Sequence, residues 1–85
     1  MHIELRFFAS VREALGLASE RIELPPGVTT VGAVRAHLVE RGGVWAQALG
    51  QDRALRMAFE HVMCGPETEV REGGEVAFFP PVTGG

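Results

Sequence analysis

The chain has 85 residues, a formal net charge of -3 and 46% hydrophobic residues. This length predicts a single domain, and the hydrophobic content is too high for a disordered chain. The acidic balance argues against a nucleic-acid partner, because binding to phosphates requires a basic surface. No apolar run reaches the roughly 18 residues of a membrane span and no signal peptide is recognisable, so we expect a cytoplasmic protein without a membrane partner. The single cysteine, Cys64, cannot form an internal disulfide, which fits a reducing compartment.

The N-terminal part of the chain predicts a strand and a short helix. Residues 2–8 alternate between polar and apolar side chains, as a half-buried strand does. Ser10 and Glu13 have the spacing of a capping box, so we expect a short helix over residues 11–15 that ends at Gly16.

A second strand and the longest helix follow. Residues 21–24 alternate and predict the strand, which the Pro25-Pro26-Gly27 turn ends. Thr29 or Thr30 is expected to cap a helix over residues 31–41. Its apolar stripe consists of Val31, Val34 and Leu38.

The C-terminal half predicts one helical turn and then strands. Residues 44–53 are expected to contain one short helical turn that covers the edge of the core. Residues 55–59, 61–64 and 75–79 read as strands. The link at Glu60-His61 lacks the glycine that tight hairpins prefer, so the turn between the first two of these strands is left open by the pattern.

This order of elements favours an α+β domain of the β-grasp, or ubiquitin-like, class. We expect a mixed sheet of four to five strands, one main helix and short helical turns. Residues 1–79 would form the domain, and residues 80–85 an extended, flexible tail.

The tail is the most informative segment. Pro80 and Pro81 favour an extended exit from the last strand, and Gly84 and Gly85 have no side chain that would clash in a narrow channel. Such a tail suits a protein whose own terminal carboxylate reacts with a partner, although a terminus without function is the commoner case.

Two segments carry a family resemblance. Residues 73–85 (GGEVAFFPPVTGG) closely resemble the C-terminus of the small, sulfur-carrying subunits of molybdopterin synthase. Residues 5–13 are similar to the first strand and following turn of that family. The similarity extends loosely over most of the chain. A Gly-Gly end alone would be less specific, because ubiquitin-like modifiers and other sulfur carriers share it.

The resemblance implies a function for the tail. A ubiquitin-activating-like adenylyltransferase would use ATP to adenylate Gly85, and sulfur delivery would then convert it to a thiocarboxylate. The tail would enter the large catalytic subunit of the synthase and give its sulfur to a cyclic pyranopterin monophosphate, which forms the molybdopterin dithiolene. The chain would bind no cofactor itself and would be an enzyme only as the small subunit of that complex. Gly84 is expected to lie at the reacting end beside Gly85. The other tail residues are expected to contact the partner: Pro80, Pro81, Val82 and Thr83.

The resemblance also implies that the first and last strands are adjacent and parallel at the centre of the sheet. In that case Phe8 and Phe79, which have the opposite phase to the core-facing residues of their strands, form an aromatic patch on the open face of the sheet. Met63 is a further candidate for this patch. Exposed aromatic patches typically mark interfaces, unless loops cover them or a bulge reverses the phase.

The side chains indicate no catalytic site and no metal site. His2, His37 and His61 lie on three separate elements, and Cys64 has no neighbouring base to activate it. The alternatives are a sulfur carrier for another pathway (thiamin thiazole or cysteine synthesis), a ubiquitin-like protein modifier, and an interaction module with an inert tail.

Overall fold

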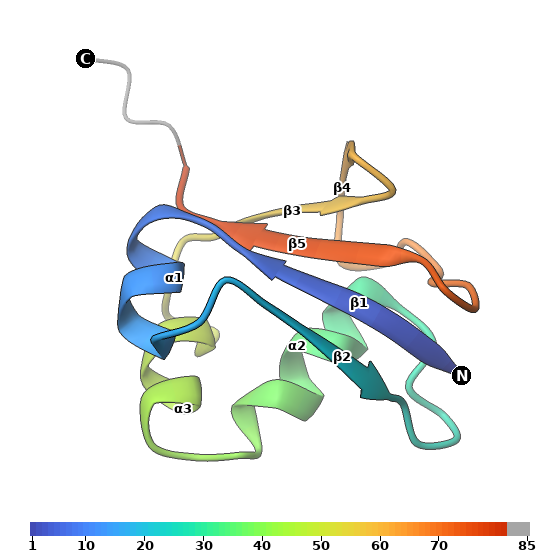
Figure 1. The fold of residues 1–85 in the computed structure, drawn as a ribbon, viewed down its shortest axis with the longest axis horizontal. Helices are drawn as coiled ribbons and strands as arrows, with labels where there is room; N and C mark the ends of the chain where they lie inside the picture. Colours follow the sequence, from blue (N-terminus) through green and yellow to red (C-terminus); the bar gives the residue numbers. More distant parts are fainter. Residues whose placement is uncertain (82–85) are drawn as a thin grey trace.

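The protein forms a five-stranded mixed sheet with three helices on one face (Figure 1). The structure, a computed structural model, describes residues 1–81. The strands are β1 (His2–Phe7), β2 (Ser19–Glu23), β3 (Arg56–Phe59), β4 (Val62–Cys64) and β5 (Glu75–Phe79), in the order β2-β1-β5-β3-β4. The helices are α1 (Ala9–Leu15), α2 (Val31–Val39) and α3 (Val44–Leu49). The predicted α+β, β-grasp architecture is confirmed.

The centre of the sheet is the parallel pair β1 and β5. Leu5 lies opposite Val76 and Phe7 lies opposite Phe78 in the register. The other neighbouring strands pair antiparallel. The predicted adjacency of the first and last strands is therefore confirmed. It places segments from the two ends of the described chain side by side (Figure 1).

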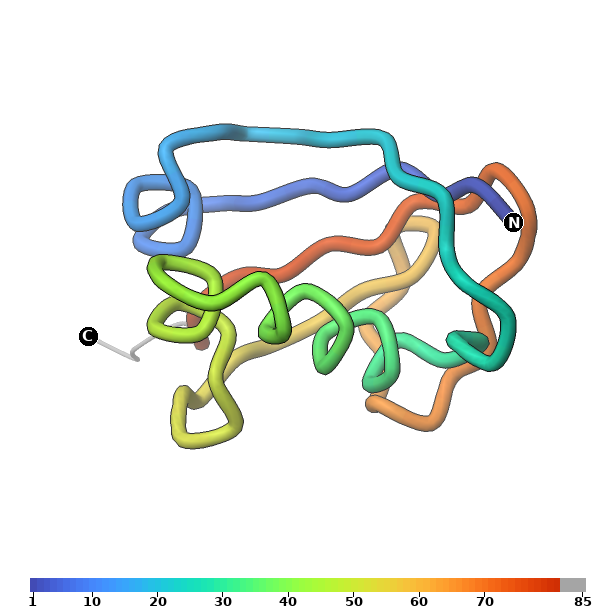
Figure 2. The backbone as a smooth tube through the Cα atoms, turned by 90° about the horizontal axis from the view of Figure 1, so that it is seen from below, coloured from blue at the N-terminus to red at the C-terminus, as the bar shows by residue number. Residues whose placement is uncertain are grey.

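The core lies between the sheet and the helical layer. Figure 2 shows α2 and α3 running across one face of the sheet, and no helix of residues 1–81 lies on the other face (Figure 1). The core consists of fully buried side chains from alternating strand positions, from the apolar stripe of α2 and from the end of α3. These are Ile3, Leu5, Phe7, Val31, Val34, Leu38, Leu49, Val76 and Phe78.

The start of α1 differs from the expectation. The helix begins at Ala9, and its N-cap is Phe8, which has no side-chain capping bond, so the predicted capping role of Ser10 is wrong. The cause is the turn at Ala9, whose φ of 51° bends the chain into the helix directly after β1. The predicted stop is confirmed, because Gly16 has φ 76° and donates its N–H to the carbonyl of Arg12.

The longer helix is fixed at both ends. The hydroxyl oxygen of Thr30 accepts a hydrogen bond of 3.1 Å from the N–H of Ala33, which confirms the cap. The helix ends at Val39, short of the expected residue 41. Arg41 then forms a two-bond ion pair with Glu20, and this hydrogen bonding lowers the pKa of the Glu20 carboxyl below its usual value.

The open question at residues 60 and 61 is resolved as a two-residue turn between β3 and β4. Glu60 and His61 both have positive φ, of 51° and 67°. A type I′ hairpin turn requires such angles and usually contains glycine or asparagine for that reason. The pairing of β3 with its neighbours therefore outweighs the local cost of the left-handed conformation.

A buried arginine joins α2 to the segment after α3. Arg35 is 6% exposed, and its guanidinium donates to the carbonyls of Leu49 (2.7 Å), Gly50 (2.5 Å) and Arg53 (2.9 Å). Burial lowers the pKa of Arg35, and the nearby charge of Asp52 opposes that shift. The bonds to Leu49 and Gly50 satisfy carbonyls at the end of α3 that have no partner within the helix, and the bond to Arg53 holds the segment that follows.

Replacing Arg35 should destabilise the domain. Arg35→Met keeps the apolar stem but removes the side-chain donor from the carbonyls of Leu49 and Arg53, while the Gly50 carbonyl keeps the N–H of Arg53. We expect a loss of about 2–3 kcal/mol in the free energy of unfolding. Arg35→Lys should lose less, because it retains a charge and part of the bonding. Urea denaturation measures both. The control is Arg12→Met at an exposed position, where a change within about 0.5 kcal/mol is expected. Equal urea midpoints for Arg35→Met and the parent would contradict the role of this network.

Candidate functional site

The candidate site lies where β1 and β5 end. Because these strands are parallel, their last residues meet at the same edge of the sheet. Phe8 directly follows β1, and Phe79 is the last residue of β5. Pro80 and Pro81 continue from β5 and are partly buried. The remaining tail residues of the prediction, Val82, Thr83, Gly84 and Gly85, lie outside the described residues.

The structure brings the two predicted aromatic rings together. The ring centroids of Phe8 and Phe79 are 6.3 Å apart, with planes at 83°, an edge-to-face arrangement. Phe8 is 41% exposed, and Phe79 is partly exposed. The guanidinium of Arg6 lies 5.6 Å from the centre of the Phe8 ring, close enough for a cation–π contact.

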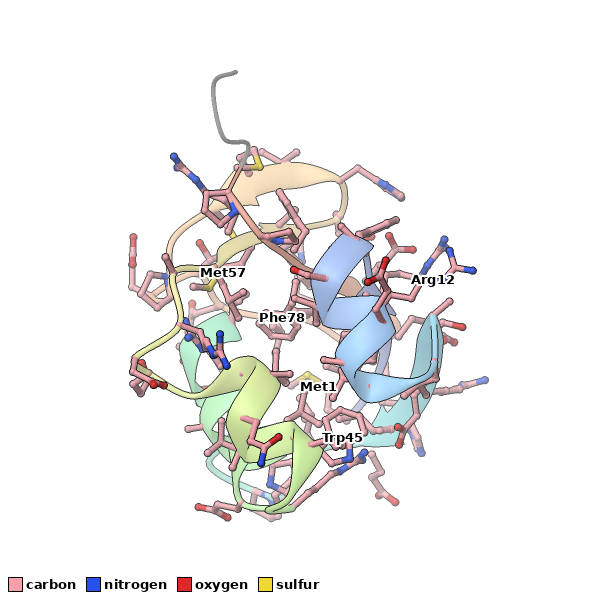
Figure 3. The ribbon with its side chains drawn as sticks, turned by 90° about the vertical axis from the view of Figure 1, so that its left-hand side faces the viewer. Met1, Arg12, Trp45, Met57 and Phe78 are labelled. Carbon is pink, nitrogen blue, oxygen red and sulfur yellow. The ribbon has the colours of Figure 1, made fainter. Side chains whose placement is uncertain are left out.

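The neighbouring residues of each strand point inward. Phe7 and Phe78 are buried, and their rings stack at 6.4 Å. Figure 3 shows Phe78 in the interior, between α1 and the segment that carries Met57. Both strands therefore have the inward and outward alternation that the sequence predicts.

Met63 lies on the same face of the sheet at some distance from the rings. It pairs with Ala58, which in turn pairs with Ala77 on β5. Met63 is 56% exposed. The two alanines lie in the middle of the face and are buried, each 7% exposed, with the rings at the edge where β1 and β5 end and the methionine on the outer strand. We call Phe8, Phe79, Ala77, Ala58 and Met63 the aromatic face.

Other ionisable and sulfur-containing groups do not assemble into a catalytic constellation. His2 lies near Glu23 and Glu72 at the surface, and the exposed His61 lies near the partly buried Glu75. Cys64 is a free, partly buried thiol. Within residues 1–81 there is no group of three or more His, Cys, Asp or Glu that could hold a metal ion. No helix of this part of the chain has the length and apolar character to cross a bilayer.

Sequence reasoning missed one feature of this region. A cavity of about 390 Å³ opens between α1, α3 and Pro80. Its lining residues come from segments far apart in the chain, among them Val11, Ala48 and Leu55. No local pattern could have indicated it, because none of these segments forms a wall alone.

Comparison with known structures defines the class of protein. A subunit 1 of a molybdopterin converting factor from Pyrococcus furiosus, described as putative, superposes with a TM-score of 0.78 at 22% identity, over 96% of this chain and 99% of that one. Subunit 1 in the complex of subunits 1 and 2 of the molybdopterin-converting factor from Helicobacter pylori gives 0.68 at 23% identity, over 100% of both chains. The chain is a ubiquitin-like β-grasp protein.

Comparison of sequences defines the family. The model of the ThiS family matches residues 5–85, and the chain belongs to that family. Two curated relatives carry the name molybdopterin synthase sulfur carrier subunit. The one from Haemophilus influenzae is 41% identical and the one from Escherichia coli 40% identical, each over 98% of this chain and 99% of the relative. The resemblance noted in the sequence is confirmed.

The contrast between outward and inward rings predicts different effects on stability. Phe8→Ala and Phe79→Ala should each lower the free energy of unfolding by about 1 kcal/mol, because they remove one partly exposed aromatic pair. Phe78→Ala, at a fully buried position, should cost about 3–5 kcal/mol. Thermal and urea unfolding measure the three variants side by side. A loss at Phe79 as large as that at Phe78 would show that the outer rings belong to the core.

Proposed function

We propose that this chain is the sulfur-carrier subunit of a molybdopterin synthase and that Gly85 carries the sulfur as a C-terminal thiocarboxylate. The observation that supports this most directly is the exposed Phe8–Phe79 pair at the root of the diglycine tail. The names of the two relatives at 41% and 40% identity support the assignment to this pathway.

The proposed chemistry begins with activation of the carboxylate. A carboxylate does not react with sulfur nucleophiles, so a ubiquitin-activating-like adenylyltransferase first joins it to AMP from ATP and releases pyrophosphate. A persulfide sulfur then attacks the carbonyl carbon of Gly85, the bond to AMP breaks, and a thiol releases the carrier from the donor by disulfide exchange. The product is a terminal thiocarboxylate. The sulfur is proposed to ride on the terminal carbonyl and not on Cys64.

In the second half of the cycle the thiolated tail enters the large subunit. The thiocarboxylate sulfur forms a C–S bond to a side-chain carbon of a cyclic pyranopterin monophosphate, and the oxygen substituent of that carbon leaves. Water then attacks the carbonyl carbon of Gly85, its C–S bond breaks, Gly85 returns to a carboxylate, and the sulfur stays on the pterin as a thiolate. A second thiolated carrier supplies the second sulfur of the dithiolene. The large subunit would supply the groups that bind the phosphate and catalyse transfer. The side chains of this chain would contribute docking and the position of the tail, which is consistent with the scattered histidines and acids of the described residues.

The aromatic face is the proposed docking surface for the large subunit. Aromatic side chains at the centre of an interface typically contribute most of its binding energy. The face adjoins the tail, so the same contact would dock the domain and direct the tail into the partner. The complex of two subunits in Helicobacter pylori supports the expectation of such a partner.

Phe8→Ala and Phe79→Ala should therefore weaken binding to the large subunit. Loss of a central aromatic anchor typically costs about 2 kcal/mol or more, roughly a thirtyfold increase in Kd. Titration calorimetry with the large subunit of the same organism measures this. The control is Val44→Ala on α3, another exposed apolar residue, which should bind like the parent. Unchanged Kd in both phenylalanine variants would reject the docking surface.

The tip of the tail gives the sharpest test of the function. Deleting Gly85, or adding one residue after it, should abolish sulfur transfer while leaving thermal unfolding unchanged. One residue moves the reacting carbon by up to about 3.5 Å, and misplacement by about 1 Å can cost about a hundredfold in rate. The assay is transfer from the thiolated protein to the pterin precursor in the presence of the large subunit.

The matched control adds one glycine at the N-terminus and should retain full activity. Mass spectrometry of the protein from its own host should also show one oxygen replaced by sulfur at Gly85. Adducts on lysines of other proteins would instead indicate a modifier. Turnover by a variant with a blocked C-terminus would exclude the carrier mechanism.

A further inference from the structure

The cavity beside Pro80 lies on the helical side of β5, whereas the aromatic face lies on the open side of the sheet. Its volume is about 390 Å³. The apolar lining comes from Val11 and Ala14 on α1, Ala48 on α3, and Leu55 and Pro80 on the segments beside β3 and β5. The root of the tail thus has an apolar surface on each of its two sides.

The lining indicates which kind of group fits the cavity. Its volume is at the lower end of the range for ligand pockets, and its walls are mainly small or aliphatic side chains. Among the described residues that line it, Arg53 is the only one with a charged side chain, and its Nε donates to the carbonyl of Gln47 at 2.9 Å. Apolar walls next to one arginine fit a small apolar side chain that has a negatively charged group beside it. They fit a polar metabolite less well.

The charges around the tail root point the same way. Arg53 and Arg56 are exposed, and neither has a carboxylate within 4.0 Å in the part of the chain that the structure describes. Arg6, Arg21 and Arg41 each lie within that distance of a glutamate. Among the described residues Arg12 and Arg71 also have no such partner, so Arg53 and Arg56 are distinguished by their position beside the tail root.

Arg56 lies beside Phe79 in the register of β3 and β5, so one such arginine stands on each side of the tail root. In a chain with a net charge of -3, this local positive charge favours an acidic partner surface.

We propose that the cavity receives an apolar side chain from an acidic segment of the large subunit, as a second docking contact. This inference rests on the proposed function and extends it. With the aromatic face on one side and the cavity on the other, the partner would hold Pro80 from two directions. Two contacts fix the direction of the tail as well as its position, which a reaction at the end of a short chain requires.

Filling the cavity tests the contact. Ala14→Leu places a larger side chain where the partner's residue would sit, and it should raise the Kd for the large subunit by about tenfold or more. The matched control is Ala36→Leu at an exposed position of α2, away from the cavity, which should bind like the parent. Thermal unfolding of both variants should be close to that of the parent, because both alanines are exposed.

The salt dependence of binding tests whether the partner segment is acidic. Binding of the parent should weaken as salt is raised from about 50 to 300 mM, since screening shortens the range of the attraction. Arg53→Gln should reduce this salt dependence and slow association. Arg12→Gln is the control, because Arg12 is exposed on the outer side of α1, away from α3 (Figure 3). Equal salt dependence in these two variants would overturn the proposed acidic partner.

A photo-crosslinking amino acid at position 14 identifies the occupant directly. The expected product joins this position to an acidic segment of the large subunit. A crosslink to this chain's own residues 82–85, to a basic segment, or to no segment at all would overturn the proposal.

These outcomes separate the inference from the function on which it rests. If Ala14→Leu and Ala36→Leu bind equally well while Phe79→Ala binds weakly, only the second contact is rejected. If the parent does not bind the large subunit, both proposals fail together.

Discussion

The parallel pairing of β1 with β5 is the constraint on which the rest of the structure depends. It sets the register in which Phe7 lies opposite Phe78, and it brings both strands to an end at the same edge of the sheet. Because successive residues of a strand point to opposite faces, one pair of phenylalanines is buried and the next pair is exposed. The same pairing thus fills the core and forms the surface at the root of the tail.

The sequence predicted those features that depend on local pattern. Alternation found the strands, and the glycine at position 16 and the threonine at position 30 marked helix ends correctly. The adjacency of β1 and β5 came from family resemblance, because alternation contains no information about partners. Ser10 was misjudged because Ala9 turns the chain one step earlier than a capping box would. The turn at Glu60 and His61 was left open because tertiary pairing imposes backbone angles that those residues do not favour.

The features that sequence reasoning missed all depend on segments that meet only in three dimensions. Arg35 falls on the apolar stripe of α2, next to Val34 and before Leu38, and a charged residue at such a position is the one signal that was available. Its role depends on carbonyls of Leu49, Gly50 and Arg53, which only folding brings to it. The cavity beside Pro80 depends in turn on the segment that these bonds hold. The guanidinium of Arg35 therefore contributes both to the stability of the domain and to the shape of the cavity.

The central position of β5 also affects how the chain acquires its fold. Its neighbour β3 is close to β5 in the sequence, whereas its other neighbour, β1, is far from it. The pairing of β5 with β1 joins opposite ends of the described residues. Contacts of such long sequence separation slow folding, because a large loop must close before they form. Until residues 75–79 have been synthesised, β1 has only β2 as a neighbour in the sheet, and an isolated pair of strands is marginally stable in water. The nascent chain therefore has an unpaired edge of β1 until its central strand arrives, and such an edge can pair with another chain.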